Sequence, residues 1–254
     1  MILDNFKLDG KVALVTGAAQ GLGQGMAVGL AEAGADICAL DRCTSDETGD
    51  LVTKRGRRFS QLCVDLRQAS VADLQEAVAT TVRALGRLDI LVNNAGIIRR
   101  APAVEFSEKD WDDVLQINLR AVFFLSQAAG RVMIPQGGGK IINVASMLSF
   151  QGGIIVPSYT AAKSGIAGIT RALANEWAKH NINVNAIAPG YMATDNTAQI
   201  RADPARSQSI LDRIPAGRWG APSDLQGIVV FLASEASNYM QGAIVPVDGG
   251  WLAR

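Results

Sequence analysis

The chain has 254 residues, 48% of them hydrophobic, with 24 basic and 24 acidic residues. This composition supports a large buried core, and the balanced charge disfavours broad binding to nucleic acid or to an anionic membrane. The polar N-terminal residues, and the lack of any apolar run of about 18 residues, predict no signal peptide and no membrane span, hence a cytoplasmic protein of one domain, residues 1–254.

Short apolar runs alternate with longer segments of helical periodicity along the chain. Seven runs are predicted to be strands: residues 11–17, 35–41, 58–65, 88–96, 140–146, 182–190 and 243–250. A helix is predicted after Ser158, its expected N-cap, because Ile166, Ile169, Leu173 and Trp177 recur at helical spacing. This order predicts an α/β fold, a Rossmann-like, doubly wound parallel seven-stranded sheet with helices on both faces. Ligands of such sheets bind at the carboxyl ends of the strands.

The first predicted strand leads into a glycine-rich turn, TGAAQGLGQG, which contains Gly17, Gly21 and Gly23. Glycine lets the backbone turn tightly and approach a pyrophosphate, and the start of the following helix offers free N–H groups and a partial positive charge. Glycines also serve ordinary turns, but their position between a strand and a helix predicts a dinucleotide site.

The second predicted strand ends at Asp41, eighteen residues after Gly23, where a carboxylate can accept hydrogen bonds from an adenosine ribose. Its charge would repel a 2′-phosphate and Gln20 is not basic, so NAD is favoured over NADP. Arg42 is the counter-evidence, because it is able to pair with that phosphate. A solvated strand end is the alternative interpretation of Asp41.

The next two strand ends extend the expected cofactor site. Asp65 follows the third strand, where a carboxylate can meet the adenine amino group. The fourth strand ends in NNAG, where the Asn93 amide can bridge strands and Gly96 lets the chain pass close to a cofactor. Ordinary turn chemistry is the alternative at both places.

Tyr159 and Lys163 are one helical turn apart, so the phenol and the ammonium can meet the same ligand. Removing a proton from an alcohol during hydride transfer needs a base, and a free tyrosine with a pKa of about 10 is too weak near neutral pH. A cation about 4 Å away contributes ~4 kcal/mol at an effective dielectric constant near 20, which lowers that pKa by roughly three before desolvation opposes it. Lys163, helped by the oxidised nicotinamide, is therefore expected to bring the pKa of Tyr159 near neutrality. Ser146, at the end of the fifth strand, is expected to polarise the substrate oxygen. Asn118 is expected to anchor a water behind Lys163, or to be a structural helix amide.

The order and spacing of these motifs resemble the short-chain dehydrogenases/reductases over essentially the whole chain: TGxxxGxG at 16–23, NNAG at 93–96, Asn118, Ser146, Tyr159 with Lys163, and Pro189-Gly190 with Thr194. The resemblance implies a catalytic tetrad of Asn118, Ser146, Tyr159 and Lys163. It implies cofactor contacts by Gly17, Gln20, Gly21, Leu22, Gly23, Asp41, Arg42, Asp65, Leu66, Asn93, Ala95, Gly96, Tyr159, Lys163, Pro189, Gly190, Met192 and Thr194. It also implies a homotetramer formed through two long helices and the C-terminal strand.

Several further stretches resemble members of this family that act on sugar acids. A sugar acid carries a carboxylate, which suits an arginine fork. The expected substrate contacts are Ser146, Met147, Gln151, Tyr159, Arg99, Arg100 and Arg218, although each arginine has a surface charge or a subunit contact as its alternative. Residues 191–221, polar and with prolines at 204 and 215, are expected to be irregular and to form a mobile substrate lid.

The remaining candidates indicate no metal and no disulfide. Cys38, Cys43 and Cys63 form no CxxC motif and are interpreted as small hydrophobic thiols, while His180 is expected to be a turn residue at the end of a helix. Two other functions are weighed. A non-catalytic NAD sensor would not need Ser146, Tyr159 and Lys163 together. A ketoreductase for carrier-bound acyl chains would use NADPH, which requires basic residues near positions 20 and 41, and only Arg42 supports this function.

Overall fold

The computed structural model describes residues 1–253, in which seven parallel strands form one sheet in the order β3-β2-β1-β4-β5-β6-β7. The strands are β1 (Val12–Thr16), β2 (Asp36–Asp41), β3 (Phe59–Cys63), β4 (Ile90–Asn93), β5 (Gly139–Val144), β6 (Ile182–Pro189) and β7 (Ile244–Val247). All seven predicted strands and the doubly wound topology are confirmed. The predicted runs extended beyond the ladders because apolar and glycine-rich loop residues continue each strand's pattern.

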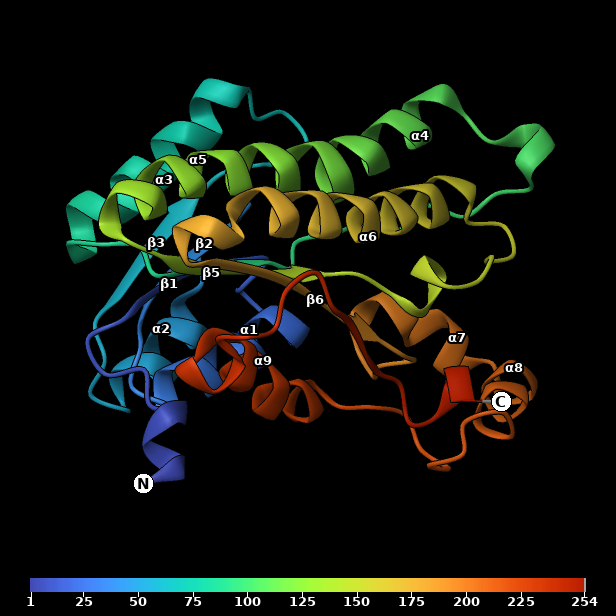
Figure 1. Ribbon diagram of the computed structural model, residues 1–254. Coiled ribbons are helices and arrows are strands. Elements are labelled where there is room, and N and C mark those ends of the chain that lie inside the picture. The colour runs from blue at the N-terminus through green and yellow to red at the C-terminus, as the bar shows by residue number, and fades with distance from the viewer. Residues whose placement is uncertain (254) are drawn as a thin grey trace.

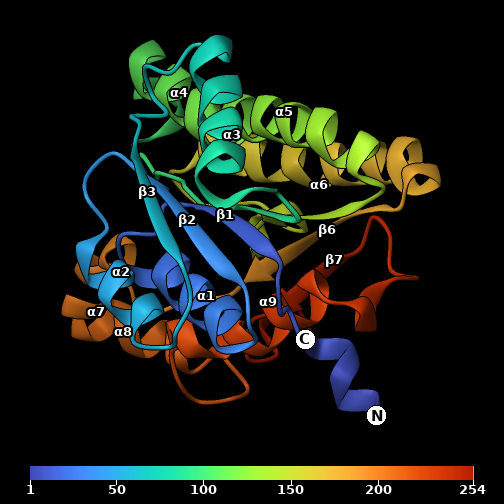
Figure 2. The same cartoon turned by 90° about the vertical axis from the view of Figure 1, so that its left-hand side faces the viewer.

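Helices cover both faces of the sheet. They are α1 (Gly21–Glu32), α2 (Asp46–Thr53), α3 (Val71–Leu85), α4 (Glu108–Leu115), α5 (Ala121–Gln136), α6 (Pro157–Trp177), α7 (Ala198–Ala202), α8 (Pro204–Leu211) and α9 (Gln226–Ala233). Figures 1 and 2 show α3, α4, α5 and α6 on one face, and α1, α2 and α9 on the other. None of the helices within residues 1–253 combines the length and the apolar character needed to cross a bilayer.

Local signals explain where several helices begin and end. Ser70 accepts a hydrogen bond from the backbone N–H of Asp73, whose carboxylate accepts from the Ser70 N–H, so α3 begins with a capping box. The helix ends at Gly86, which has φ 93° and donates its N–H to the Val82 carbonyl. These paired end groups stabilise α3 independently of its packing on the sheet.

The predicted N-cap of α6 was wrong. Val156 is the N-cap and Pro157 is the first helical residue, while Ser158 lies inside the helix with a buried Oγ that has no hydrogen-bond partner among the described residues. The physical reason is that proline has a φ already fixed near helical values and has no N–H to satisfy, so it begins the helix two residues earlier.

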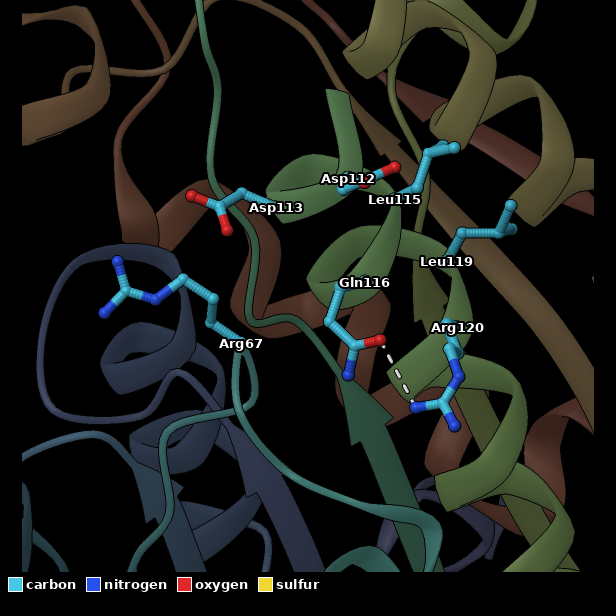
Figure 3. A pocket seen from close by; sticks show the side chains of 7 residues that line it. All are labelled: Arg67, Asp112, Asp113, Leu115, Gln116, Leu119 and Arg120. Carbon is cyan, nitrogen blue, oxygen red and sulfur yellow. Dashed lines mark hydrogen bonds between the residues drawn. The ribbon is translucent and has the colours of Figure 1, made fainter. Parts of the chain in front are cut away.

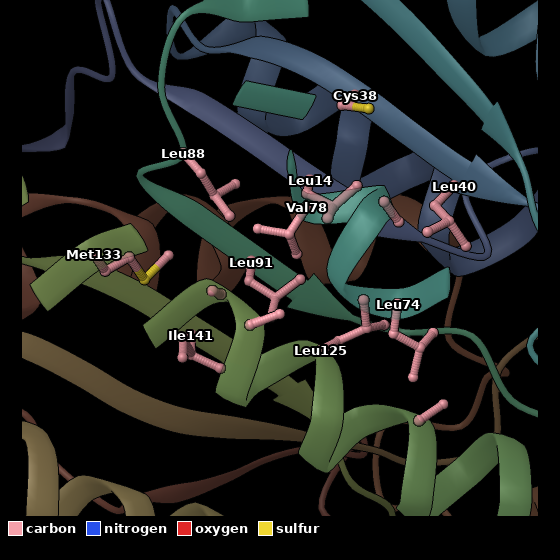
Figure 4. Close-up of a cluster of buried hydrophobic side chains, with 14 of the residues drawn as sticks. Leu14, Cys38, Leu40, Leu74, Val78, Leu88, Leu91, Leu125, Met133 and Ile141 are labelled. Atoms are coloured by element: carbon pink, nitrogen blue, oxygen red, sulfur yellow. The ribbon is translucent and has the colours of Figure 1, made fainter. Parts of the chain in front are cut away.

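Two apolar layers hold the helices to the sheet. On the α3–α6 face, Leu14, Leu91 and Ile141 from the strands pack with Leu74 and Leu125 from the helices (Figure 4). A second layer lies beneath α1 and α9 and includes strand residues such as Ala13 and Ile37. Full burial of a leucine side chain contributes about 2 kcal/mol, so these layers fix the strand ends that carry the polar site.

Residues 191–221 are not irregular as expected. They contain a 3-10 turn (Asp195–Thr197) followed by α7 and α8. Their base is closed where Ala193 N–H donates to the Gly220 carbonyl (2.7 Å) and Gly220 N–H donates to the Tyr191 carbonyl (2.9 Å). Pro204, expected to disrupt helix, instead begins α8 behind the capping side chain of Asp203.

Candidate active site

The carboxyl ends of the parallel strands lie along one edge of the sheet, and the strand order reverses between β1 and β4. Crossovers leave these two strands in opposite directions along the sheet, which separates their loops and opens a crevice between them. Most of the predicted site residues come from the loops at this edge and from the first two turns of α1 and α6, whereas Asn118 lies between α4 and α5.

Tyr159 and Lys163 share one face of α6, as predicted from their spacing. Lys163 Nζ lies 5.5 Å from the centroid of the Tyr159 ring, on the same side of the helix. The lysine is 4% exposed, and Nζ donates a hydrogen bond of 2.5 Å to the Val144 carbonyl at the end of β5. The ammonium is therefore held between the sheet and the phenol.

Ser146 lies two residues after β5, where it caps the 3-10 turn Met147–Ser149. Its Oγ accepts a hydrogen bond from the Leu148 N–H at 3.2 Å. A hydrogen bond between the Ser146 and Tyr159 side chains lowers the pKa of Tyr159. The serine hydroxyl, the phenol and the lysine thus occupy one corner of the site.

The acidification of Tyr159 by Lys163 and the oxidised nicotinamide stays a prediction, because the chain's own groups alone shift this pKa upward. Burial raises the pKa of Tyr159 above its ordinary value, and this effect exceeds the lowering by the Ser146 hydrogen bond and by the charge of Arg100. Burial also lowers the pKa of Lys163, to about 8. Both shifts have one physical reason, because desolvation penalises the charged form of an acid and of a base alike.

Asn118 occupies a π-helical turn, Gln116–Arg120, between α4 and α5. Its side chain is fully buried, and its two polar atoms form a pair of 2.9 Å hydrogen bonds with the backbone of Ile97: Oδ1 accepts from the N–H, and Nδ2 donates to the carbonyl. These two bonds fit the structural-amide interpretation of Asn118, which fixes the loop that follows NNAG. The water anchor stays a prediction.

The glycine loop packs against the NNAG turn. Gly17 and Gly21 have φ values of 66° and 61°, and a Cβ on Gly23 would lie 2.0 Å from the Gly17 carbonyl oxygen and 2.5 Å from Asn94 Nδ2. No side chain caps the start of α1, and its first turn has no acidic residue. The loop therefore leaves helix N–H groups and their partial positive charge for an anion, which fits a pyrophosphate.

Asp41 and Gln20 both make contacts at the rim of this loop. Asp41 Oδ2 accepts from the Ala19 N–H (3.0 Å) and Oδ1 accepts from the Arg42 N–H (2.7 Å), which places a carboxylate between the first two strand ends. Gln20 Nε2 donates to Asp195 Oδ2 (2.9 Å). The glycine loop is thus tied to residues 191–221.

The remaining expected cofactor residues differ in what they touch. Asn93 Nδ2 bridges β4 to β5 through Asn143 Oδ1 at 2.9 Å, so the predicted amide bridge between strands is found. Asp65 accepts from the Arg67 backbone and side chain, and Leu66 is buried in the core. Met192 is also a core residue. Its side chain and that of Leu66 are buried, so only their backbone can face a ligand.

The later loop residues surround the glycine loop. Gly190, which directly follows Pro189, donates its N–H to the Val247 carbonyl. A Cβ on Gly190 would lie 2.6 Å from Asp248 Cα. The Thr194 methyl group would lie 3.8 Å from a Cβ on Gly21. Leu22 and Ala95 pack against the two core layers on either side of the loop.

Two of the three predicted substrate arginines are engaged elsewhere. Arg99 pairs with Asp110 (3.0 Å), and Arg218 forms two hydrogen bonds with Asp224 (2.7 and 2.8 Å). Arg100 forms no ion pair within residues 1–253 and donates only to the Asn196 carbonyl (3.2 Å). Arg99 and Arg218 are thus held by carboxylates of the chain itself, as the surface-charge alternative describes, and their role toward a substrate stays a prediction.

Met147 and Gln151 face the C-terminal turn of the chain. Met147 is 6% exposed and packs in an apolar cluster with Trp251, and Gln151 Oε1 accepts a 3.4 Å hydrogen bond from Trp251 Nε1. The Met147 side chain thus packs against the C-terminal turn, and its expected contact with the substrate stays a prediction. Trp251 was not predicted as a site residue, and nothing in its local sequence indicates these contacts.

Thr16 and Asn94 were also missed as site residues. Thr16 Oγ1 accepts from the backbone N–H groups of Asn94 (3.0 Å) and Ala95 (2.9 Å), and Asn94 Nδ2 donates to the Thr16 carbonyl (2.9 Å). These bonds join the β1 and β4 loops across the point where the strand order reverses. Their place inside the TG and NNAG motifs was the available signal.

The cysteine prediction holds for only one residue. Cys38 is buried, and burial raises the pKa of its thiol, whereas Cys43 and Cys63 are exposed. Cys63 ends β3, an edge strand of the sheet that residues 1–253 form, so no neighbouring strand covers its outer side.

His180 ends a 3-10 turn before Asn181, which has a left-handed backbone conformation, as predicted. No group of metal-ligating side chains occurs within residues 1–253.

A hollow of about 450 Å³ lies beside α4 and the π-helical turn (Figure 3). It is lined by Arg67, Asp112, Asp113, Leu115, Gln116, Leu119 and Arg120. Leu115 and Leu119 point to the side away from Arg67 in this view. None of the predicted catalytic residues lines it.

Comparison with known proteins identifies close relatives. Residues 17–252 match a family described as enoyl-(acyl carrier protein) reductase. The 2-dehydro-3-deoxy-D-gluconate 5-dehydrogenase of Escherichia coli is 64% identical over 255 residues, with 100% of both chains covered. A crystal structure of a gluconate 5-dehydrogenase from Burkholderia cenocepacia in complex with NADP and tartrate is 38% identical, with a TM-score of 0.94 and 100% of both chains covered. A crystal structure of carveol dehydrogenase from Mycobacterium avium in complex with NAD is 33% identical, with a TM-score of 0.92, 98% of this chain and 99% of that chain covered.

Proposed function

Because the chain belongs to the short-chain dehydrogenase/reductase family, we propose that it transfers a hydride between NAD and a secondary hydroxyl or ketone of a sugar acid. The substrate we favour is that of a 2-dehydro-3-deoxy-D-gluconate 5-dehydrogenase, supported by full-length identity of 64% to one. The observation that carries the proposal is the gathering of Ser146, Tyr159 and Lys163 in one corner, with Lys163 Nζ 5.5 Å from the phenol ring.

The chain's own residues divide the chemistry between them. In the oxidising direction Tyr159, as phenolate, takes the proton from the substrate hydroxyl, and in reduction it returns that proton to the carbonyl oxygen. Ser146 donates a hydrogen bond to the same oxygen. Lys163, and Arg100 through its charge, stabilise the phenolate. A nicotinamide cofactor, when bound, would supply the hydride acceptor for oxidation and the hydride donor for reduction.

The cofactor is proposed to bind with its pyrophosphate at the uncapped start of α1 and its adenosine beside Asp41. The Asp41 carboxylate is held at the end of β2 by two backbone N–H groups, so its negative charge faces the ribose and opposes a 2′-phosphate. NAD is therefore proposed over NADP. Asp41→Ala is expected to lower kcat/KM for NAD and raise it for NADP, measured with one substrate at fixed concentration.

The experiment that tests the proposal is an assay of the purified protein with NAD or NADH and a panel of sugar acids and neutral ketones. We expect activity on 2-dehydro-3-deoxy-D-gluconate, and near-complete loss of turnover in Tyr159→Phe with retained NADH binding. Near-normal turnover in that variant would exclude Tyr159 as the acid/base. A higher kcat/KM for gluconate would favour a gluconate 5-dehydrogenase, the second candidate, which the 38% identical crystal structure supports.

Arg100 is proposed to bind the substrate carboxylate, since it is free of an ion pair within residues 1–253 and its charge already acts on Tyr159. Arg100→Ala is expected to raise KM for the sugar acid far more than for a neutral ketone. Arg99→Ala is the matched control, because Arg99 pairs with Asp110. Equal effects of Arg100→Ala on both substrates would remove the carboxylate role.

The oligomer is proposed to be a homotetramer, with one contact made by the outer face of α4 and the π-helical turn. Asp112 and Arg120 have no ion pair within residues 1–253, and Leu115 and Leu119 lie between them in sequence. A second copy packed antiparallel across a twofold axis would set Asp112 against the partner's Arg120, and the reverse, around an apolar centre.

Charge reversal tests this contact. Asp112→Arg and Arg120→Asp are each expected to shift the protein toward smaller species in sedimentation velocity, because each places like charges opposite one another. The double variant restores opposite charges and is expected to restore the larger species. A wild-type monomer, or single variants with unchanged sedimentation, would contradict the proposed contact.

A further inference from the structure

The C-terminal turn of the chain is seated against the end of residues 191–221. Gly249 and Gly250 have φ values of 64° and 90°, and Ala216 N–H donates to the Gly249 carbonyl at 3.0 Å. A Cβ on Gly249 would lie 2.9 Å from Ile214. Positive φ together with this close approach requires glycine, so the position of the C-terminal turn relative to Ile214 is tightly defined.

Trp251 follows these glycines and contacts both walls of the catalytic corner. It is 5% exposed and packs in one apolar cluster with Met147, Ile210 and Ile214. Met147 directly follows Ser146, whereas Ile210 lies on α8. Trp251 Nε1 also donates to Gln151 Oε1 at 3.4 Å. One side chain thus contacts the turn that carries Ser146 and the helix of the lid segment.

The orientation of the indole ring is fixed from two further directions. The Tyr191 ring meets it edge-on, with centroids 4.8 Å apart and planes at 62°. The Arg213 guanidinium lies 4.0 Å above its ring centroid, a cation–π distance. Since Tyr191 lies just beyond β6 and Arg213 just beyond α8, the indole is clamped between the sheet edge and the lid segment.

We propose that Trp251 is a positioning residue that couples residues 191–221 to the turn carrying Ser146, so that the lid and the Ser146 hydroxyl reach their working positions together. The proposal rests on the proposed function. Trp251 is buried and does not touch the reacting atoms; it acts through Met147 and Gln151. A displacement of about 1 Å in a group that contacts the substrate can lower the rate about 100-fold.

Two substitutions separate the parts of this role. Trp251→Ala removes the packing between Met147 and Ile214, and kcat with the sugar acid is expected to fall about 100-fold. Trp251→Phe keeps an apolar ring but loses the donor to Gln151, and should recover most of that activity. The NADH dissociation constant, measured by fluorescence, is expected to change far less than kcat, because the start of α1 lies outside the cluster and is linked to residues 191–221 through the Gln20–Asp195 hydrogen bond.

Trp177 supplies the matched control. It is also a buried tryptophan, 8% exposed, whose Nε1 donates to a side-chain oxygen, that of Glu176 at 3.3 Å, but it ends α6 far from Ser146. Trp177→Ala is expected to lower the melting temperature as Trp251→Ala does, while kcat stays within about twofold. This comparison separates a positioning role from general loss of packing.

A second readout does not depend on the substrate. Trypsin cleavage at Arg201 and Arg206, in the lid segment, is expected to be at least about fivefold faster in Trp251→Ala than in the wild type or Trp177→Ala, because the segment loses its anchor. If kcat and the cleavage rate in Trp251→Ala match those of Trp177→Ala, the positioning role is refuted. If the wild type turns over no sugar acid, the proposed function fails, and the cleavage rates alone decide the coupling.

Discussion

Replacing Lys163 is predicted to make folding more stable at neutral pH while abolishing activity. Burial lowers the pKa of Lys163 from its ordinary 10.5 to about 8 in the folded protein. That difference corresponds to roughly 3 kcal/mol lost from the free energy of unfolding whenever the lysine is charged in both states. Because the side chain is 4% exposed, solvent screening does little to reduce this penalty.

The sign of the pH dependence follows from which state binds more protons. Below pH 8 the lysine is protonated in both the folded and the unfolded state, so the full cost of burying its charge is subtracted from the free energy of unfolding. Between pH 8 and 10.5 the unfolded chain holds the proton more strongly, and stability therefore rises with pH as the folded lysine becomes neutral. By pH 10 less than about 1 kcal/mol of the penalty is left.

Lys163→Met keeps the length of the side chain but loses the hydrogen bond to the Val144 carbonyl, which costs about 1 to 2 kcal/mol at any pH. The variant is thus expected to be about 1 to 2 kcal/mol more stable than the wild type at pH 7, and about 1 kcal/mol less stable at pH 10. Urea unfolding of both proteins at equal concentration and several pH values measures this difference. Lys179→Met, which removes an exposed charge, is the control. A wild-type-to-variant difference that does not vary between pH 7 and pH 10 would refute the reasoning.

Three other substitutions test the packing of the site. Gly23→Ala is expected to abolish NADH binding and to lower the melting temperature, since its Cβ would lie 2.0 Å from the Gly17 carbonyl oxygen. Thr16→Val leaves two backbone N–H groups of the β4 loop without their acceptor, so we expect a loss of about 2 kcal/mol in urea unfolding together with weaker NADH binding. Ser70→Ala removes the cap of α3 and is expected to cost about 1 kcal/mol while kcat is unchanged; altered kcat would show that α3 acts on the site.

Much of the fold was predictable from short-range patterns. Strands covered on both faces are short continuous apolar runs, and the helices between them repeat apolar residues at three- and four-residue steps, so the seven strands and their parallel order could be inferred. The i,i+4 spacing of Tyr159 and Lys163 predicted that they share a face of α6, because helix geometry is local.

The polar contacts of the site could not be predicted in the same way. Arg99 and Arg100 are neighbours in the sequence, yet Arg99 pairs with Asp110 while Arg100 reaches Asn196, 96 residues further along the chain. Sequence spacing gives the residue types available at a strand end, but it does not say which carboxylate lies within 4 Å of which guanidinium. That depends on how the loops pack.

The protonation of Tyr159 shows the same division between sequence and tertiary structure. Sequence alone determined that a phenol, an ammonium and a hydroxyl are present with the spacing needed to meet, and that a glycine-rich turn precedes a helix. Only the tertiary structure decided how deeply the phenol is buried, that burial outweighs the favourable hydrogen bond and charge, and that Trp251 reaches Met147 from the far end of the chain. The reason is physical: desolvation and packing depend on every atom around a group, and most of those atoms belong to residues distant in sequence.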